Sequence, residues 1–416
     1  MKRKLLVQMR NEWRDNIWLV AALIVVSLSV WILSLMLWYE VAGIFIGRGY
    51  DFEDVYSIRV ESLPSESPEY TDYGENKRSL ENEDRLYLMR QIRQSPNVEA
   101  AAWSRNALPY TMNFYGNSAF LVGEEQDTIG YIANVRSASP DIVKVLKLKS
   151  TTGKSLDELA GRLAARDILI TVSYNDDKSR PAKELLGKVV SIGHDTTKNY
   201  RVADVLEAIH RTDYEITWGG SLIQPVNDEY PKSMWEIAVR VKPGCGDAFI
   251  KEFDSTPAMQ QHGNLYLSQL TRLADTRRAI QSDTDTSVRI TVSLMIVILI
   301  VIFLGLLGTF WFRVQQRVAE IAIRKVCGAS NMAIFMRIIG EGIILLLMAS
   351  VIGAILFWTA YYLNYISTFP ITAEKDVNLY AELFTVIVVG IGIIISLSWP
   401  AYKAMHIEPA IAVKDE

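Results

Sequence analysis

The chain has 416 residues, 50% of them hydrophobic, and a formal net charge of −4 at neutral pH. The negative charge argues against a nucleic-acid-binding role, which would need a strongly basic face. The hydrophobic residues are bunched into long runs, which is the distribution of a membrane protein.

Four apolar runs are long enough to cross a membrane. Runs without any charged side chain cover residues 17–39, 290–312, 342–373 and 383–402. At a rise of about 1.5 Å per residue, a helix of roughly twenty residues spans the hydrocarbon core of about 30 Å. We predict four transmembrane helices, at 17–40, 288–312, 333–363 and 382–402.

The first sixteen residues carry apolar side chains at three- and four-residue intervals among basic ones. This pattern predicts a cytoplasmic amphipathic helix at 1–16, lying in the membrane interface, and a helical lead-in to the first span is equally consistent with it. A cleaved signal peptide is disfavoured, because the apolar run is too long and Glu40 stands where a small residue is needed. We predict an uncleaved anchor.

Residues 44–286 are predicted to form one large domain outside the membrane. Strand-like alternation occurs at 54–60, 98–103, 120–122, 129–135, 167–172, 189–192, 200–205 and 235–241. Helical patterns occur at 86–92, 247–253 and 265–280. Mixed elements without an internal repeat indicate an α+β domain. Short connections at both ends tie it to membrane helices, which suits mechanical coupling.

A basic segment at 313–332 separates the second and third spans. Its apolar positions recur near the helical period, and charged residues fill the gaps. The apolar positions are Val314, Val318, Ile321 and Val326, and the charged ones are Arg317, Glu320, Arg324 and Lys325. Gly328 and Ser330 then predict a break.

The distribution of Lys and Arg predicts the orientation of the spans. Basic residues precede the first span, fill 313–332 and follow the fourth span at Lys403, whereas the loop 364–381 is acidic. We therefore predict that both termini, the segment 313–332 and the tail 403–416 are cytoplasmic. The domain at 44–286 and the loop 364–381 then lie outside the cell membrane.

No pattern of catalytic or metal-binding residues emerges from the chain. Its histidines, His194, His210, His262 and His406, lack the spacing of a zinc site. Gly153-Lys154-Ser155 resembles the end of a phosphate-binding loop, but Leu148 stands where a glycine is required, and we predict a turn. Cys245 and Cys327 are predicted on opposite sides of the membrane and cannot pair. We expect no catalytic residue, no metal site and no bound cofactor.

Arg337 and Glu341 stand four residues apart at the start of the third span. Within the membrane, charged groups are costly and would be functional candidates. At the interface they would simply pair along the helix. Both interpretations stay open at this point.

The stretch Arg317-x-x-Glu-Ile-Ala-Ile-Arg-Lys-Val-x-Gly-Ala-Ser330 resembles the signature of ABC-transporter permeases of the MacB/FtsX type. The ending Pro400-Ala-Tyr-Lys-Ala-Met-His-Ile-Glu-Pro-Ala410 is similar to that family's ending, and Ser139 to Leu148 with Gly153-Lys154 is similar to its outer domain. The resemblance covers the whole order of spans and implies an α-helical membrane protein with four transmembrane helices and an inserted extracytoplasmic α+β domain.

The resemblance also implies partners. ATP would be bound and hydrolysed by a separate cytoplasmic ABC ATPase, and 313–332 would be the coupling helix seated on it. The implied coupling residues are Arg317, Glu320, Ile321, Ile323, Arg324, Lys325, Gly328 and Ala329. A second permease copy or a paralogue would complete the complex in the bacterial inner membrane, and a periplasmic adaptor and an outer-membrane channel are further expected partners.

The implied function is ATP-driven export or mechanotransmission, in which closure of the ATPase pair changes the outer domain. A signalling permease that regulates an envelope enzyme or a sensor kinase is the alternative within the same architecture. A ligand-binding receptor is a third class, disfavoured because neither the N-terminal segment nor the tail is long enough for an output domain. A membrane-anchored enzyme on the outer face is a further, disfavoured class. It would predict that the isolated fragment 50–280 turns over a substrate without an ATPase or the membrane.

Overall fold

The computed structural model describes residues 13–45, 47–111, 113, 115–123, 130–173, 179–193, 199–214, 220–226, 235–363 and 375–406. It divides into two compact units, the first comprising 1–40 with 285–416 and the second comprising 41–284. The amphipathic helix predicted at 1–16 falls outside the described residues as far as residue 12. The same holds for 364–374 of the predicted loop and for the tail from residue 407.

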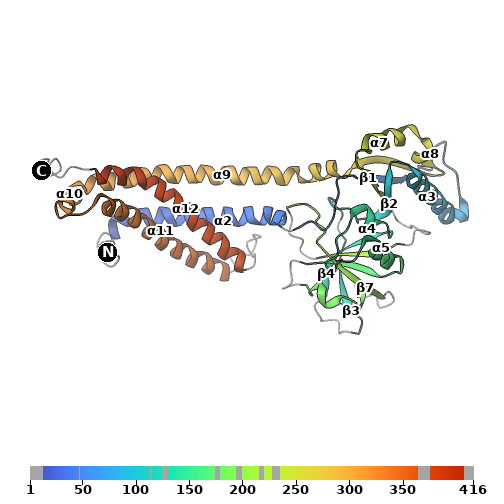
Figure 1. Ribbon diagram of the computed structural model, residues 1–416, viewed down its shortest axis with the longest axis horizontal. Helices are drawn as coiled ribbons and strands as arrows, with labels where there is room; N and C mark the ends of the chain where they lie inside the picture. Colours follow the sequence, from blue (N-terminus) through green and yellow to red (C-terminus); the bar gives the residue numbers. More distant parts are fainter. Residues whose placement is uncertain are drawn as a thin grey trace. The chain divides into compact units, whose positions relative to one another are not determined.

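The first unit is a bundle of long helices (Figure 1). They are α2 (Trp13–Val41), α9 (Leu273–Gln316), α11 (Asn331–Tyr362) and α12 (Lys375–Met405), with the short α10 (Val318–Val326) between α9 and α11. Each long helix has a stretch long and apolar enough to cross a membrane, with mean hydropathy between 2.3 and 3.2. The predicted fold class, four membrane helices with a large α+β domain after the first, is confirmed.

Side chains from all four long helices meet inside this bundle. Leu23 of α2, Phe310 of α9, Leu346 of α11 and Leu397 of α12 are all at most 5% exposed. Outward-facing residues such as Ile300 and Val351 are apolar as well, as expected for helices surrounded by lipid. A Cβ at Gly342 would clash with Leu397 and Ile393, so this glycine lets α11 and α12 approach closely.

Among the described residues, the second unit is built on one eleven-stranded sheet, in the order β10-β11-β1-β9-β2-β4-β3-β6-β7-β5-β8. The strands are β1 (Val55–Ser62), β2 (Val98–Arg105), β3 (Gly116–Leu121), β4 (Tyr131–Ala138), β5 (Ile168–Thr171), β6 (Val189–Ile192), β7 (Asn199–Leu206), β8 (Gly220–Pro225), β9 (Glu236–Val241), β10 (Gln261–His262) and β11 (Leu265–Arg272). Because β8 also pairs with β4 in parallel, the second half closes on itself.

The closed half is inserted in the chain between β2 and β9, and we call residues 106–226 the inserted barrel. Only Ser104 and Arg105 of β2 pair with β4, so few strand hydrogen bonds join the barrel to the open sheet formed by β10, β11, β1, β9 and β2. Each half has its own core, around Trp103 and Phe249 in the open sheet and around Tyr131 and Val190 in the barrel. A third buried cluster, including Leu146 and Tyr110, lies between them.

Helices cover both halves of this unit (Figure 1). They are α3 (Lys77–Gln94), α4 (Ile142–Leu146), α5 (Leu156–Ala164), α6 (Ala182–Leu185), α7 (Gly246–Ser255) and α8 (Pro257–Gln260), with 3-10 turns at η1 (Ala42–Phe45) and η2 (Gly74–Asn76). In α5 a capping box joins Ser155 and Glu158, which explains the helix start that follows the predicted Gly153-Lys154 turn.

The helix predicted at 265–280 is wrong in its first half. Residues 265–272 form β11, which pairs antiparallel with β1, and α9 begins only at Leu273. Leu265 and Leu267 are buried and Ser268 is exposed, which is a period-two pattern that the short stretch does not separate from a helical one. The segment predicted as one helix at 313–332 is also divided, because α9 continues to Gln316 and α10 starts after Arg317.

Candidate functional site

The candidate site is α10 with the adjoining ends of α9 and α11. Arg317 leaves helical geometry between α9 and α10, with φ −107° and ψ 17°. After α10, Gly328 adopts a φ of +91°, which a residue with a side chain would adopt only with strain. The Oγ of Ser330 then accepts a hydrogen bond from the backbone N–H of Ala333 at 3.2 Å, in the first turn of α11.

The inner face of α10 is apolar and buried. Ile321 is 8% exposed and Ala322 is fully buried. Ile321 belongs to a small core that draws on three long helices, with Val314, Ile334, Ile338, Ala401 and Ala404. Burial of such side chains is worth about 1.5–3 kcal/mol each. The short helix is therefore fastened to the bundle.

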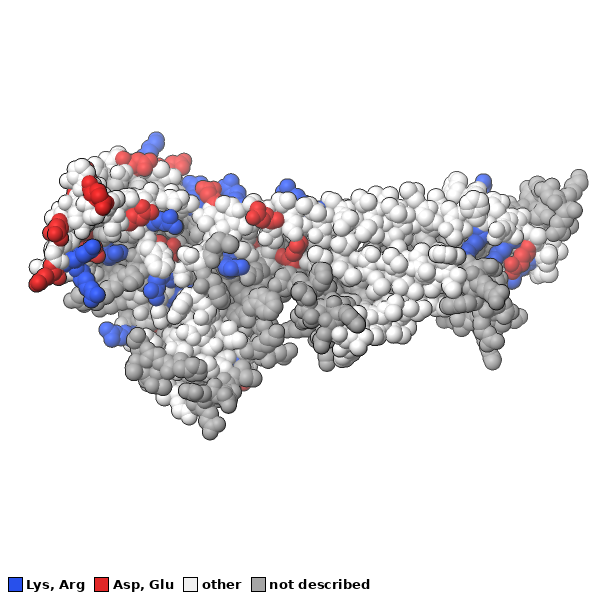
Figure 2. Space-filling view, turned by 180° about the vertical axis from the view of Figure 1, so that it is seen from behind, with Lys and Arg blue, Asp and Glu red and all other residues white. Residues whose placement is uncertain are grey.

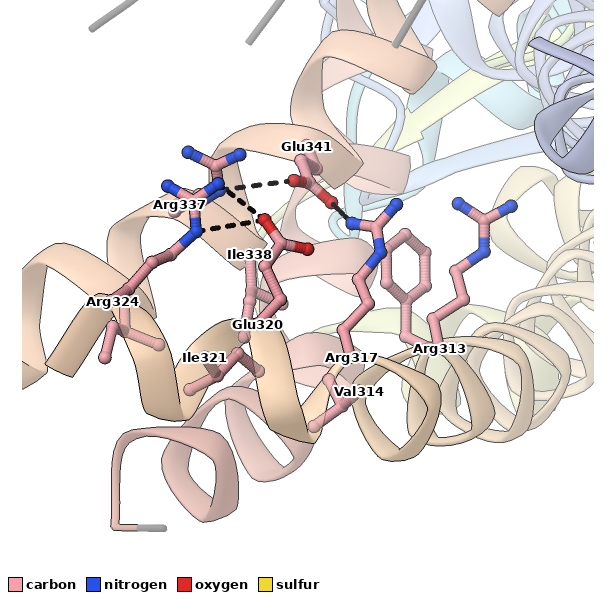
Figure 3. A pocket seen from close by; sticks show the side chains of 11 residues that line it. Arg313, Val314, Arg317, Glu320, Ile321, Arg324, Arg337, Ile338 and Glu341 are labelled. Carbon is pink, nitrogen blue, oxygen red and sulfur yellow. Dashed lines mark hydrogen bonds and ion pairs between the residues drawn. The ribbon is translucent and has the colours of Figure 1, made fainter. Parts of the chain in front are cut away.

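A charged cluster lies beside this core (Figure 3). Glu341 accepts a hydrogen bond from Nη1 of Arg317 at 3.0 Å and has Nε of Arg337 at 3.7 Å. The Glu341 side chain is 13% exposed, so its ion pairs are largely shielded from water. Arg337 thus pairs along α11, while Arg317 ties Glu341 to the junction of α9 and α10. Glu320 and Arg324 form a separate, more exposed pair at 3.0 Å within α10.

A small pocket of about 40 Å³ opens among these side chains. Its charged lining comprises Arg313, Arg317, Glu320, Arg324, Arg337 and Glu341. Four arginines against two glutamates leave an excess of positive charge. The guanidinium of Arg313 also lies 5.7 Å from the centre of the Phe310 ring, a cation–π distance.

Charged side chains on the long helices lie toward the helix ends, and the site is at one of these ends. Figure 2 shows that the middle of the visible surface of the long helices carries no Lys, Arg, Asp or Glu, and that basic and acidic residues lie toward the ends. The apolar surface suits lipid, and the charged end suits water or another protein.

Residues 292–409 match the family model described as FtsX-like permease C-terminal. This match spans the end of α9, all of α10 and α11, and α12. This part of the chain is similar to the C-terminal part of FtsX-like permeases.

A second comparison concerns solved structures. A solved structure titled as the extracellular domain of the noncanonic ABC-type transporter YknZ from Gram-positive bacteria is similar at 11% sequence identity and a TM-score of 0.30. The likeness covers 51% of this chain and 100% of the other. That score is too low to carry an argument. None of the curated proteins matches the chain.

The structure places the eight predicted coupling residues in three different settings. Ile321 and Ala329 pack inside against the small core, so neither presents the apolar surface contact that the sequence suggested for Ile321. Arg317 points to Glu341 rather than outward. The remaining five lie at least partly at the surface: Glu320, Ile323, Arg324, Lys325 and Gly328.

Two exposed apolar side chains stand out on α10. Ile323 is 59% exposed and Val326 is 71% exposed. Val326 was not predicted as a site residue, nor was Arg313 of the pocket. Arg313 and Arg317 are four residues apart, and this helical spacing was the available signal for the arginine. Val326 gave no such signal, because its exposure depends on which face of α10 meets the bundle.

The turn at Gly153 and Lys154 has a structural explanation. Gly153 has a φ of +82°, and Nζ of Lys154 lies 3.4 Å from the fully buried carboxylate of Asp204. Ser150 and Thr152 also donate hydrogen bonds to Asp204. Elsewhere in the described part of the chain, no three His, Cys, Asp or Glu side chains come together as a metal site would need.

Proposed function

We propose that this permease is the membrane subunit of an ATP-driven ABC transporter and that α10 is the surface on which a separate cytoplasmic ATPase docks. The family match over 292–409 supports this most directly, because it includes α10 and its neighbours. A short helix with an apolar inner face and an exposed apolar tip next to charged groups fits a protein contact. ATP hydrolysis would then belong to the partner.

The proposed orientation places α10 and both termini in the cytoplasm. Basic residues cluster before α2, around α10 and at Lys403, and such residues favour the cytoplasmic side of bacterial membranes. The second unit, residues 41–284, is then extracytoplasmic.

The contacts of α10 suggest how force would pass from an ATPase. Ile321 and the pair between Arg317 and Glu341 hold α10 to α9 and α11, so a push on α10 displaces both helices. α9 is continuous over 44 residues and enters the second unit. Motion of α9 along its axis would therefore reach the outer unit without any substrate path through the bundle.

The cycle that we propose is mechanotransmission in support of export. Two ATPase subunits need two docking surfaces, so a second permease copy or a paralogue would complete the complex in the inner membrane. A periplasmic adaptor and an outer-membrane channel are the partners that export across two membranes would need. A regulatory permease, acting on an envelope enzyme or a sensor kinase, would use the same docking surface.

The test uses the exposed side of α10. The tagged full-length permease is co-expressed with each ABC ATPase of the source genome, and co-purification and ATP hydrolysis are measured in lipid nanodiscs. Ile323→Asp and Lys325→Glu should each abolish co-purification, because they place negative charge in a contact that is apolar and basic. Gln315→Glu is the matched control, since Gln315 is also exposed but lies on α9, and it should leave binding at the native level.

Assembly of an ATPase with both α10 variants at native affinity would contradict the proposal. Glu320→Lys removes the ion pair within α10 and places a second positive charge beside Arg324. If the complex with this variant still hydrolyses ATP at the native rate, that result would also contradict the proposal.

A further inference from the structure

Two segments join the second unit to the membrane helices, and both meet the same loop of the inserted barrel. We call residues 43–49, which follow α2, the first connector, and residues 273–281, the first turns of α9, the second connector. The loop is 207–214, directly after β7. The N–H of Gly43 donates to the carbonyl of Tyr214 at 3.1 Å, and the N–H of Gly49 donates to the carbonyl of Ala208 at 2.9 Å.

One carboxylate in this loop holds both connectors. Oδ2 of Asp213 accepts hydrogen bonds from Nη2 of Arg48 at 2.9 Å and from Nε of Arg277 at 2.6 Å. Its Oδ1 accepts from the hydroxyl of Tyr110, within the inserted barrel, at 2.8 Å. The Asp213 side chain is only 7% exposed. Three parts of the chain that are distant in sequence therefore converge on one buried group.

The two arginines also share an aromatic partner. The guanidinium of Arg48 lies 5.4 Å from the centre of the Phe52 ring, and that of Arg277 lies 5.3 Å from it. Phe52 is 8% exposed and packs edge-on against Tyr110, with the two ring centres 5.2 Å apart. Two cations on one ring repel each other, and the Asp213 carboxylate offsets that repulsion.

Behind the loop, Arg136 fixes it to β4. Arg136 is 1% exposed and donates to the carbonyl of Ile209 at 3.5 Å. It also donates to the carbonyls of Asn106 and Leu108, at 3.1 Å in both cases, and to Oγ of Ser221 at 3.0 Å. Arg136 of β4 thus links the loop 207–214 to both β4 and β8. We therefore expect the loop and the barrel to move together.

We propose that Asp213 is a joint that fastens both connectors to the inserted barrel, so that displacement of either membrane-linked helix moves the barrel with it. Few strand hydrogen bonds join the barrel to the open sheet. The joint adds a charged link between the connectors and the barrel to the buried apolar cluster that includes Phe52, Tyr110 and Leu273. The joint itself is independent of any ATPase, whereas its use in force transmission rests on the proposed function.

The first experiment measures hydrogen exchange of the full-length permease in nanodiscs, without nucleotide or ATPase. Asp213→Asn should raise exchange in both connectors roughly tenfold or more, because hydrogen bonds to a charged group contribute at least that factor to an equilibrium constant. Arg48→Gln should release only 43–49, and Arg277→Gln only 273–281. Exchange in β1 and β9 should rise less than exchange in the released connectors in all three.

Asp84→Asn is the matched control. Asp84 is also a buried carboxylate, 6% exposed, and accepts a hydrogen bond from the hydroxyl of Tyr73 at 2.7 Å, but neither connector touches it. It should leave both connectors at native exchange. The joint is refuted if Asp213→Asn releases one connector or neither, or if it raises exchange in β1 and β9 as much as in the connectors.

A second experiment adds the co-purified ATPase and ATP. In the native permease, turnover should change exchange in the first connector and in the barrel strands β4 and β8 together. In Asp213→Asn it should change the connector alone. If turnover changes hydrogen exchange in β4 and β8 equally in the native protein and in Asp213→Asn, then Asp213 does not transmit the motion to the barrel. Failure of the proposed function would give a different result. No ATPase would then change hydrogen exchange in the native protein, while the effect of Asp213→Asn on the connectors without nucleotide would remain.

Discussion

Two carboxylates in this molecule each hold two arginines, and they do so in different ways. Glu341 pairs with Arg337 on its own helix and with Arg317, 24 residues earlier. Asp213 pairs with Arg277, 64 residues later, and with Arg48, 165 residues earlier. The first cluster closes a short helical junction, whereas the second closes long loops and exists only when the whole outer unit is folded.

This difference predicts different consequences of breaking each cluster. Loss of Glu341 frees α10 from α11, but Ile321 and its apolar neighbours still hold α10 in place. Loss of Asp213 removes the shared partner of two connectors and leaves their two arginines close together beside Phe52, without the carboxylate that offsets their repulsion. The local cluster is thus supported by packing, and the long-range cluster depends on its charge.

The largest effect is expected at Arg136, which supports the Asp213 cluster from behind. Arg136→Met leaves several buried carbonyls without a donor and should destabilise the outer unit by about 3–5 kcal/mol, the range for breaking a buried charged network. Burial lowers the pKa of Arg136 to about 10, so the side chain is still charged at neutral pH. Thermal unfolding of the detergent-purified chain measures the loss.

The control for that measurement is Arg90→Met on α3. Arg90 is exposed, and surface substitutions usually change stability by less than about 0.5 kcal/mol. If Arg136→Met melts no earlier than this control, Arg136 does not support the loop 207–214.

An intermediate loss of stability is expected when either carboxylate, Asp213 or Glu341, is neutralised. Asp213→Asn should cost about 2 kcal/mol and Glu341→Gln about 1 kcal/mol, because hydrogen bonds to charged groups contribute about 1.5–3 kcal/mol and packing compensates partly at Glu341. The melting temperatures of the two variants in the same detergent provide the comparison. If Glu341→Gln lowers the melting temperature more than Asp213→Asn does, the Glu341 cluster contributes more to stability than the Asp213 cluster, contrary to our prediction.

The pH dependence sharpens the same comparison. Burial acts to raise the pKa of Asp213, but hydrogen bonds from Tyr110 and Arg277 and the charge of Arg48 outweigh it and hold the pKa below its usual value. In the unfolded chain the carboxyl group has a pKa of about 3.9, so the stability contributed by Asp213 is complete well above that pH and is lost as pH falls through the lower folded pKa.

The measurable quantity is the difference in melting temperature between the native protein and Asp213→Asn. It should stay constant from about pH 7 to about pH 5 and shrink in more acidic solution. A difference that grows on acidification would show that the folded pKa of Asp213 is raised instead.

The sequence supports the membrane part of the fold better than the outer part. Runs such as 290–312 have no charged residue and are long enough to cross the membrane as a helix, which satisfies every backbone hydrogen bond within the segment. β11 was predicted as helix because eight residues do not distinguish period two from period 3.6, and its pairing with β1 decides the outcome. The short strand β8, with Gly220 and Pro225 at its ends, was not predicted at all.

The same contrast holds for the site. The four-residue spacing of Arg337 and Glu341 made that pair visible in the sequence. Nothing marks Asp213 among the 47 acidic residues, because its partners are brought to it by the sheet topology. The inward orientation of Ile321 was also hidden, since the amphipathic pattern of α10 defines two faces but not which of its apolar residues lies at the edge.

The smallest effect on stability is expected at the exposed pair of α10. Glu320 and Arg324 are 39% and 40% exposed, and a pair four residues apart on a helix contributes only about 0.3–0.5 kcal/mol. Glu320→Gln should therefore leave the melting temperature almost unchanged, while Glu341→Gln, in the shielded cluster a few residues away, should not. Docking of an ATPase should show the opposite order, with Glu320→Gln weakening co-purification more than Glu341→Gln, because the exposed carboxylate is available to a partner and the shielded one is engaged with Arg317. If both variants weaken docking in proportion to their loss of stability, α10 contributes through folding alone and its exposed charges do not contact the partner.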